Sequence, residues 1–548
     1  MSNWKKSGDY KSLLEIITKK NGLSAKDILD PKPISPDSLE NLRGAAGYIL
    51  AAIDCDTPIY IVGDYDADGI TSTAILYKMI TALGGRVSPI IPRRFTDGYG
   101  ISTNLIKAIR DSLIITVDNG ISANEAICAA AEQKNTVIII DHHLPQEIIP
   151  AADIVVDPHV SPEENDFTDY CGAGLAYKLA ELMCELVNCD TYQIPMLDIT
   201  VLACLGTIAD VMPMISDNRH IIKKGLKILN DENAFNQLSA GIRSVMQLAG
   251  APYTEDTIKF QIGPILNACG RLYDHGSLSV LKELLTTDER LALQYAAKMK
   301  EVNDRRKAMV SAWFEKIEPN CKEQSDQPII ILRAEEVPEG IVGILTGKIA
   351  EAYKRPAFLF TRSKDDQDVY KGSGRSFGGF DISPMVNAVL PLCVTGGGHA
   401  GAAGLSVRSD NWQTLCDTMT GFMIDHGQAV DTSLYYDMEI TEEEVEQLCN
   451  EQKLFAPYGE GVEKPIFLIR NFNLIQNQYG DTVRLMGSKS EHIKLMGGSV
   501  SAVAFGMAEK YISMGQPKSL DLLFTIDENT YKGKTTPQLS VIDMRAGY

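Results

Sequence analysis

Short apolar segments, several of them ending in aspartate, place the strongest limit on how this chain can fold. They are rich in β-branched residues, and segments with helical periodicity separate them. Such alternation is typical of a parallel, doubly wound α/β sheet, and ligands bind such sheets at the carboxyl ends of the strands. The predicted strands span residues 58–64, 86–92, 113–120, 136–143 and 152–158.

Asp64, Asp66 and Asp68 crowd the end of the first predicted strand, in the sequence GDYDADG. Two such charges about 6 Å apart repel by roughly 3 kcal/mol at an effective dielectric constant of 20, so a positive group has to compensate them. An EF-hand calcium loop is excluded, because Ile75 stands where that loop needs its bidentate glutamate. On its own, the stretch also fits a solvated acidic turn that caps the next helix.

Further metal-binding residue types follow two other predicted strands and an apolar segment. Asp118 ends IITVDNG, Asp141-His142-His143 ends TVIIIDHH, and Asp210 lies in LACLGTIADVMP. Buried carboxylates need a partner or a metal ion, and aspartates mixed with histidines suit Mn²⁺ or Mg²⁺, with imidazole favouring Mn²⁺. The pattern therefore predicts divalent-metal chemistry, and an aspartate that bridges two ions would form a site for hydrolysis of a phosphodiester.

After about residue 160 the pattern changes. Helical periodicity ends in a long helix predicted over 291–317, and a second α/β unit runs from 328 to about 430. Beyond an acidic helix at 441–452, short apolar runs alternate with turns, as in a small β-barrel. We divide the chain into an N-terminal segment (1–45), a doubly wound domain with a helical extension (46–290), a connecting helix (291–325), a second, smaller α/β domain (326–432) and a C-terminal barrel (433–548).

The second α/β unit contains the glycine-dense segment VTGGGHAGAAGLSV at 394–407. It has no helix or strand propensity of its own. Glycine permits close approach of the backbone to a ligand and exposes N–H groups to an anion. The alternative interpretation is a tight packing turn.

Taken in order, GDYDADG, VDNG, DHH and GTIADVMP resemble the four motifs of the DHH phosphoesterase family, and the nearest branch is that of the RecJ single-stranded-DNA exonucleases. The resemblance continues through GPILNACGRL, GSGRSFGGFDI, GGGHAGAAG and FAPYGEG, so it covers nearly the whole chain. It implies a DHH domain, a DHH-associated substrate-binding domain and an OB-fold nucleic-acid-binding domain, in that order.

The resemblance also implies roles for single residues. By this resemblance, the metal ligands of this chain would be Asp66, Asp68, Asp118, His142 and Asp210. Asp118 would bridge two ions, and Asp64 would lie beside them as a ligand or a supporting neighbour. His143 would contact the scissile phosphate or orient its neighbour, with an ordinary core histidine as the alternative, so the catalytic set is Asp118, His142 and His143. The substrate-binding set is Asn267, Arg271, Ser373, Arg375, Gly397, Gly398 and His399.

The implied function is hydrolysis of single-stranded DNA from the 5′ end to 5′-mononucleotides in DNA recombination and repair, with two Mn²⁺ or Mg²⁺ ions. The alternatives are a short-oligonucleotide or cyclic-dinucleotide phosphodiesterase of the same superfamily and a non-catalytic scaffold that binds single strands. The net charge of −20 argues against indiscriminate coating of nucleic acid and fits a protein that holds multivalent cations.

The sequence also bears on location and partners. No apolar stretch approaches the roughly 18 residues of a membrane helix. The start, MSNWKKSGDYKSLLEIITKK, lacks the apolar core of a signal peptide. We therefore expect a cytoplasmic monomer that acts on single-stranded DNA, with a helicase and a single-strand-binding protein as candidate partners.

Overall fold

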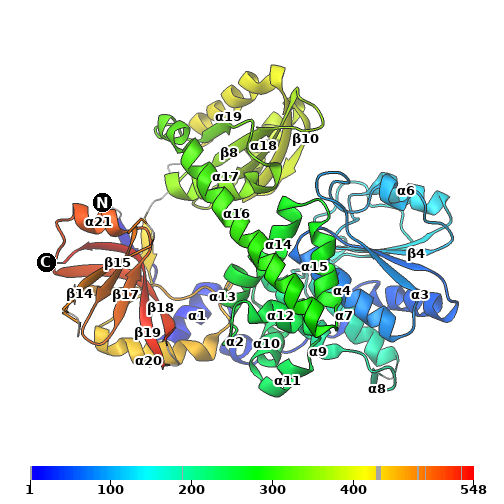
Figure 1. Cartoon of the computed structure of the whole chain (residues 1–548), viewed down its shortest axis with the longest axis horizontal. Coiled ribbons are helices and arrows are strands. Elements are labelled where there is room, and N and C mark those ends of the chain that lie inside the picture. The colour runs from blue at the N-terminus through cyan, green and yellow to red at the C-terminus, as the bar shows by residue number, and fades with distance from the viewer. Residues whose placement is uncertain are drawn as a thin grey trace.

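The computed structural model describes residues 3–187, 189–427, 433–477, 480–487, 489–531 and 534–547. These residues form three lobes, each built on a sheet (Figure 1). The long helix α16 runs from the first lobe towards the second, and the third lobe, coloured orange and red, consists mainly of strands. Among the described helices, none combines the length and the apolar character that crossing a membrane requires.

The first lobe contains the predicted doubly wound sheet. Its strand order is β3-β2-β4-β5-β6, and all neighbours are parallel. Each strand lies within one of the predicted apolar segments, so the predicted fold class is confirmed. The bounds are β2 (Ile59–Val62), β3 (Val87–Ile90), β4 (Leu113–Val117), β5 (Thr136–Ile140) and β6 (Ile154–Val156).

Alternate residues of these strands enter two separate cores, as the period of two along a strand requires. Ile115 and Val117 of β4 belong to the core shared with α3, α4 and α7, whereas Ile114 belongs to the core shared with α5 and α6. The sheet is thus covered on both faces. The covering helices are α3 (Leu42–Asp54), α4 (Ala67–Ala82), α5 (Thr103–Ile106), α6 (Asn124–Glu132) and α7 (Gly172–Leu186).

A helical extension completes the first lobe and brings α14 beside α4. A π-helical segment (Ile258–Ile262) leads directly into α14, which carries Asn267 and Arg271. The helix predicted over 291–317 is α16, which begins after the capping residue Asp288. The bounds are α8 (Cys189–Tyr192), α9 (Met196–Ala209), α10 (Ser216–Asn230), α11 (Glu232–Gln237), α12 (Ala240–Gln247), α13 (Glu255–Thr257), α14 (Gly263–Leu272), α15 (Gly276–Leu285) and α16 (Glu289–Glu323).

The second lobe has the strand order β10-β11-β9-β8-β7. Its glycine-dense segment forms a hairpin of β10 and β11, although the sequence shows no strand propensity there. Pairing of β11 with β9 on its other edge outweighs that weak propensity. The bounds are β7 (Ile330–Arg333), α17 (Glu339–Tyr353), β8 (Ala357–Arg362), β9 (Val369–Arg375), α18 (Ser383–Val389), β10 (Cys393–Gly398), β11 (Ala402–Arg408) and α19 (Trp412–His426).

The third lobe has the strand order β13-β14-β18-β19-β17-β16-β15. Its strands lie in the apolar runs predicted to form the C-terminal domain. The predicted acidic helix is a short 3₁₀ turn followed by α20. The bounds are β13 (Met438–Glu439), α20 (Val445–Gln452), β14 (Phe467–Asn473), β15 (Val483–Met486), β16 (His492–Met496), β17 (Ser501–Ala504), α21 (Ala508–Ser513), β18 (Ser519–Tyr531) and β19 (Lys534–Ala546).

The N-terminal segment joins the third lobe. Strand β1 (Trp4–Lys6) pairs in parallel with β12 (Leu434–Tyr436). Helices α1 (Leu13–Asn21) and α2 (Ala25–Leu29) contribute Ile16 and Ile28 to the core that also holds Phe467 and Phe524. The sequence did not predict this association, because it joins segments more than 400 residues apart.

A buried arginine ties the first lobe to the third. Arg219 of α10 is fully buried. Its guanidinium donates to the backbone oxygens of Ile28 at 2.8 Å, Pro457 at 2.7 Å and Phe455 at 2.6 Å. These bonds fix the chain entering β14 against the helical extension.

Candidate active site

Acidic groups and an imidazole converge at the carboxyl edge of the first sheet. Asp64 follows β2, Asp118 follows β4 and His142 lies two residues beyond β5. Asp118 adopts a left-handed backbone (φ 62°), and its N–H donates to the oxygen of Ile140 at 3.0 Å. Asp210 caps the end of α9 in the adjoining helical layer. The candidate ligands therefore come from both the sheet and the helices.

Helix ends hold Asp66 and Asp68, which lie at the start of α4. Asp66 caps α4 and accepts from the N–H groups of Asp68 at 3.0 Å and Gly69 at 3.1 Å. Asp68 accepts from the first N–H groups of α7, Gly172 at 2.7 Å and Ala173 at 2.9 Å. Asp66 therefore caps α4, which was the alternative interpretation of the acidic stretch. The same residue also belongs to the candidate ligand cluster.

Two glycines let the helices approach these carboxylates. A Cβ atom at Gly172 would lie 2.6 Å from the Cβ of Asp118, and one at Gly206 would lie 2.8 Å from Oδ1 of Asp68. Real Cβ atoms essentially never approach other atoms so closely. Helices α7 and α9 therefore reach the acidic cluster because these positions lack side chains.

The structure brings together all six residues predicted as metal ligands. His142 Nε2 lies 3.1 Å from Asp118 Oδ1, 3.8 Å from Asp210 Oδ2 and 3.9 Å from Asp68 Oδ2. Among the described residues, overlapping sets offer ligand atoms within 4.8 Å of one another, and Asp118 and His142 each belong to two of them. The sets are Asp64, Asp66 and Asp118; Asp68, His142 and Asp210; and Asp118, His142 and His143.

Burial makes this cluster electrostatically unfavourable without cations. Burial, followed by the charge of Asp66, raises the pKa of Asp64 well above its usual range. Burial and the charge of Asp68 do the same to the pKa of Asp118, and they raise the pKa of Asp210 to about 8. Burial also lowers the pKa of His142, which favours the neutral imidazole that a metal needs. Oxygen donors with one imidazole fit Mn²⁺ or Mg²⁺.

Asp141, the first residue of DHH, orients His143. Its Oδ1 lies 2.7 Å from His143 Nδ1 and accepts the N–H of His142 at 2.8 Å, while its Oδ2 accepts the N–H of Ile121 at 2.9 Å. Although burial works in the opposite direction, the hydrogen bond with Asp141 raises the pKa of His143 to about 9. His143 is thus a partly exposed imidazolium beside the cluster, not an ordinary core histidine.

Tyr99 lies against the His143 ring. Its hydroxyl donates to the backbone oxygen of Asp118 at 2.9 Å and lies 3.2 Å from His143 Nε2. Sequence reasoning assigned no role to Tyr99 or to Asp141. The position of Asp141 at a strand end was a signal for the latter, whereas the loop that carries Tyr99 gave none.

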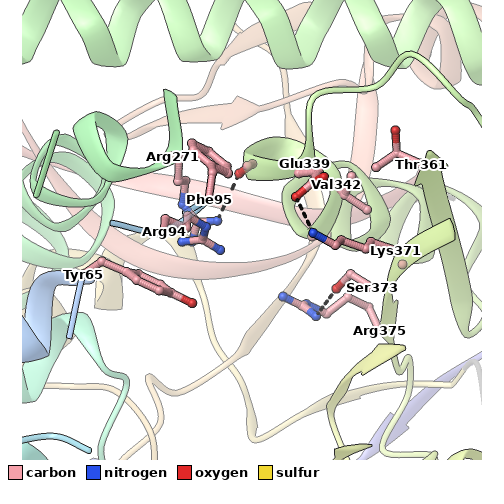
Figure 2. A pocket seen from close by; sticks show the side chains of 13 residues that line it. Tyr65, Arg94, Phe95, Arg271, Glu339, Val342, Thr361, Lys371, Ser373 and Arg375 are labelled. Carbon is pink, nitrogen blue, oxygen red and sulfur yellow. Dashed lines mark hydrogen bonds and ion pairs between the residues drawn. The ribbon is translucent and has the colours of Figure 1, made fainter. Parts of the chain in front are cut away.

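A cationic cavity of about 380 Å³ lies between the first and second lobes beside Tyr65 (Figure 2). Arg271 and Arg375, both predicted to bind substrate, line it from opposite lobes, together with Ser373. Arg375 Nη1 donates to Ser373 Oγ at 2.9 Å, and Arg271 Nη1 donates to the oxygen of Gly340 at 3.4 Å. Burial lowers the pKa of Arg271 to about 10, so it stays charged at neutral pH.

Two further cationic side chains that line this cavity were not predicted from the sequence. The guanidinium of Arg94 lies 4.5 Å from the centre of the Tyr65 ring, and Lys371 pairs with Glu339 of the same lobe at 3.5 Å on the opposite wall (Figure 2). Arg94 follows the predicted strand 86–92, so its place at the carboxyl edge was a usable signal. Such positive charge inside a chain of net charge −20 marks a local anion site.

Asn267 lies where it supports the acidic loop. Its Oδ1 accepts the N–H of Ala67 at 2.8 Å, the first helical residue of α4. The hydroxyl of Ser277 also bonds this loop, through the oxygen of Tyr65 at 2.5 Å. In this structure, Asn267 therefore positions the acidic loop that leads into α4 through its oxygen.

The glycine-rich hairpin faces the side of the candidate ligand cluster that carries His142 and His143. Gly398 and His399 line a second cavity of about 660 Å³ together with His142, His143 and Tyr99. Gly397 lies on β10 opposite Gly404 of β11 and is exposed to solvent. His399 thus shares a cavity with His143, although the two belong to different lobes.

Comparison with known proteins agrees with this architecture. Residues 58–207 match the family described as "DHH family, N-terminal domain", residues 326–425 match the DHHA1 domain and residues 436–543 match the RecJ OB domain. A crystal structure of RecJ in complex with Mn²⁺ from Thermus thermophilus superposes with a TM-score of 0.82 at 26% identity, over 100% of this chain and 80% of that one. The same protein was also solved with Mg²⁺.

Curated relatives match over most of the sequence. The single-stranded-DNA-specific exonuclease RecJ of Bacillus subtilis is 29% identical over 93% of this chain, which spans 64% of that protein's length. The protein of the same name from Dickeya dadantii is 31% identical, over 92% of this chain and 90% of its own length. The domain matches and the identity along nearly the whole chain, together with the ligand cluster, show that the protein belongs to the RecJ family.

Proposed function

We propose that this chain is a metal-dependent exonuclease that hydrolyses single-stranded DNA from the 5′ end and releases 5′-mononucleotides. The observation that carries this proposal is the partly buried cluster of Asp64, Asp66, Asp68, Asp118, His142 and Asp210 beside a cationic cavity. The cluster fits divalent cations, and the cavity fits a phosphate. The names of the relatives, single-stranded-DNA-specific exonucleases, support the choice of substrate.

The acidic cluster and His142 would hold two ions of Mn²⁺ or Mg²⁺, with Asp118 contributing to both. When bound, the ions supply an activated water and neutralise charge on the phosphodiester. The chain's own residues orient the substrate around them. His143 is held by Asp141 through Nδ1, so we assign its Nε2 to donate to a phosphate oxygen. The two helix ends that bond Asp66 and Asp68 fix the carboxylates in place.

The cationic cavity accounts for the polarity of cleavage. Arg94, Arg271 and Arg375 surround a space next to Tyr65, which lies between Asp64 and Asp66 in the chain. Arginine forks suit a terminal phosphate, which offers more oxygens and more charge than a phosphodiester. A 5′-phosphate bound there would place the next phosphodiester of the strand at the ligand cluster. One nucleotide would therefore be released in each cut.

Selection of single strands would be steric. The cavities lie between two α/β lobes, and a cleft of this kind admits one backbone but excludes a duplex. The third lobe, which matches the RecJ OB domain, would guide the strand, because OB folds commonly bind single strands in a groove. Buried Arg219 holds that lobe against the first one, so the guiding surface would be fixed in position.

The alternatives are less well supported. A short-oligonucleotide or cyclic-dinucleotide phosphodiesterase has no need for the domain at 436–543. A non-catalytic scaffold has no need for a complete, partly buried set of candidate metal ligands. We further propose that the protein acts as a cytoplasmic monomer in recombination and repair, with a helicase and a single-strand-binding protein as partners.

The domain boundaries also remain proposals: 1–45, 46–290, 291–325, 326–432 and 433–548. The boundary at 432 falls at residues 428–432, which lie outside the described residues.

The test is digestion of matched 5′-labelled, 3′-labelled and duplex oligonucleotides with Mn²⁺, comparing the unmodified protein with Asp118→Ala. We expect immediate release of the 5′ label as a mononucleotide, gradual shortening of the 3′-labelled strand and an intact duplex. Asp118→Ala should lose this activity. Release of the 3′ label first, or equal decay of duplex and single strand, would contradict the proposal.

A further inference from the structure

A single acidic side chain lies in the cationic cavity (Figure 2). Among the described residues that line this cavity, Glu339 is the one acidic residue, and it stands against the four cations Arg94, Arg271, Lys371 and Arg375. A site for a terminal phosphate gains nothing from a carboxylate, because two negative charges repel each other. Phosphate binding alone therefore does not explain Glu339.

The fold directs Glu339 towards the groups that would hold a phosphate. Glu339 is the first residue of α17, and Gly343 lies one turn further along the same face of that helix. A Cβ atom at Gly343 would lie 3.2 Å from Arg375 Nη2 and 3.3 Å from Ser373 Oγ, so this face of α17 meets β9. Lys371, Ser373 and Arg375 are alternate residues of β9 and point to one side of the sheet. Glu339 thus faces the same row of side chains.

Only one oxygen of the Glu339 carboxylate is paired. Its Oε2 lies 3.5 Å from Lys371 Nζ, whereas Oε1 is buried and has no hydrogen-bond partner among the described residues. Lys371 has a second acidic partner, Asp365 Oδ2 at 3.1 Å, so its charge is compensated without Glu339. A carboxylate with a free oxygen in this cavity acts on any anion that enters it.

A purely structural role explains less. An acidic residue in the first turn of a helix stabilises the helix through its dipole, but this effect needs no burial. Glu289, for example, begins α16 and is 66% exposed. Glu339 is only 16% exposed and lies among cations. Its place at the start of α17 does not require that position.

Hydrolysis leaves the released nucleotide with its own 5′-phosphate in the cationic cavity. Water adds to the scissile phosphorus, the P–O3′ bond breaks and the 3′ oxygen leaves with a proton, so the shortened strand carries a new 5′-phosphate. The mononucleotide has to leave before that new end can enter the cavity. A cavity with cations alone would hold the phosphate of the product as tightly as that of the substrate.

We propose that Glu339 weakens the grip of the cationic cavity on a terminal phosphate, so that the 5′-mononucleotide is released after each cut. Glu339 is then a residue that sets the balance between recognition of the 5′ end and release of the product. This inference rests on the proposed function and adds to it a determinant of turnover.

The experiment compares Glu339→Gln, which removes the charge and keeps the shape, with Glu351→Gln as the matched control. Glu351 lies on the same helix, pairs with Lys354 at 3.1 Å and lines neither cavity. The strands carry either a 5′-phosphate or a 5′-hydroxyl. Fluorescence anisotropy in EDTA gives their affinities without cleavage, and release of mononucleotide with Mn²⁺ gives kcat and KM. Calorimetry with thymidine 5′-monophosphate gives the affinity for product.

Glu339→Gln should raise the ratio of the affinities, 5′-phosphate over 5′-hydroxyl, about tenfold, which is the size of one charge contact across a partly solvated cavity. Thymidine 5′-monophosphate should also bind about tenfold more tightly. For the phosphorylated strand KM should fall, and kcat should fall several-fold because release of the product slows. Glu351→Gln should match the unmodified protein in every measurement.

An unchanged or lower ratio of affinities for Glu339→Gln would overturn the proposal, since Glu339 would then hold Lys371 ready for the phosphate and not oppose it. A higher ratio with an unchanged kcat would also overturn it, because release of the product would not depend on Glu339. Absence of cleavage by the unmodified protein would instead count against the exonuclease function. In that case the anisotropy and the calorimetry would still decide whether Glu339 weakens phosphate binding, because binding needs no chemistry.

Discussion

Replacing Arg375 with methionine removes one positive charge from the cationic cavity but keeps a side chain of similar length. Its Nη1 is held by Ser373 Oγ at 2.9 Å and by the oxygen of Gly374 at 2.8 Å, which presents Nη2 beside Gly343. If this cavity receives a 5′-phosphate, the substitution should weaken recognition of that phosphate and leave the ligand cluster unchanged.

The expected magnitude follows from the type of bond lost. A hydrogen bond to a charged group contributes about 1.5–3 kcal/mol, which corresponds to a factor of about 10 to 150. Arg375→Met should therefore lower kcat/KM for a 5′-phosphorylated strand by that factor. The value for the matching 5′-hydroxyl strand should change little, because it lacks the group that Arg375 would bind.

The assay measures kcat/KM for both strands at saturating Mn²⁺, and the ratio of the two values is the readout. Arg408→Met serves as the control, since Arg408 lies in the same sheet, is largely exposed and pairs with Asp366 at 3.8 Å. The control should keep the original ratio. If Arg375→Met lowers both values equally, or leaves their ratio unchanged, the cavity does not select the 5′ end.

Three further substitutions test the packing of the helices at the acidic cluster, the attachment of the third lobe and a buried carboxyl group. Gly206→Ala should lower both the stability and the Mn²⁺ affinity, measured by thermal unfolding and calorimetry, because its Cβ would lie 2.4 Å from the Cβ of Ala173 and 2.8 Å from Asp68 Oδ1. Gly47→Ala, with open space around it, should change neither. Arg219→Met should leave buried carbonyl oxygens of the third lobe unpaired and destabilise its attachment by about 3 kcal/mol, seen as faster proteolysis between the lobes. Burial raises the pKa of Glu283 from 4.5 to about 8, and both its oxygens lack a partner among the described residues. The folded state therefore loses stability as the pH rises through this range, so Glu283→Gln should match the unmodified melting temperature at pH 4 and exceed it at pH 9. Equal melting temperatures at pH 9 would refute this.

The sheet and the ligand cluster were predictable because local sequence determines them. Apolar runs of strand length gave β2, β4 and β5, and the parallel arrangement placed Asp64, Asp118 and His142 at one edge. No long-range information was needed for this step, since the carboxyl ends of parallel neighbours always meet at the same edge. Asp210 could be identified from the sequence because an acidic residue in an apolar segment needs a partner.

Other features depend on contacts that no local pattern encodes. The hairpin of β10 and β11 forms in spite of its glycines, because β9 pairs along β11. Strand β1 finds its partner β12 across almost the whole chain. The supporting roles of Asn267 and Tyr99 follow from single hydrogen bonds to Ala67 and to Asp118, which only the tertiary structure supplies.

Binding of Mn²⁺ to the metal-free protein tests the central claim most directly. Titration calorimetry should find two ions per chain for the unmodified protein and a marked loss of both for Asp118→Asn, because Asp118 belongs to overlapping ligand sets. Asp157→Asn is the control, since Asp157 is also a buried aspartate directly after a strand but lies outside those sets. If Asp118→Asn takes up both ions as well as Asp157→Asn does, the account of the metal centre is wrong.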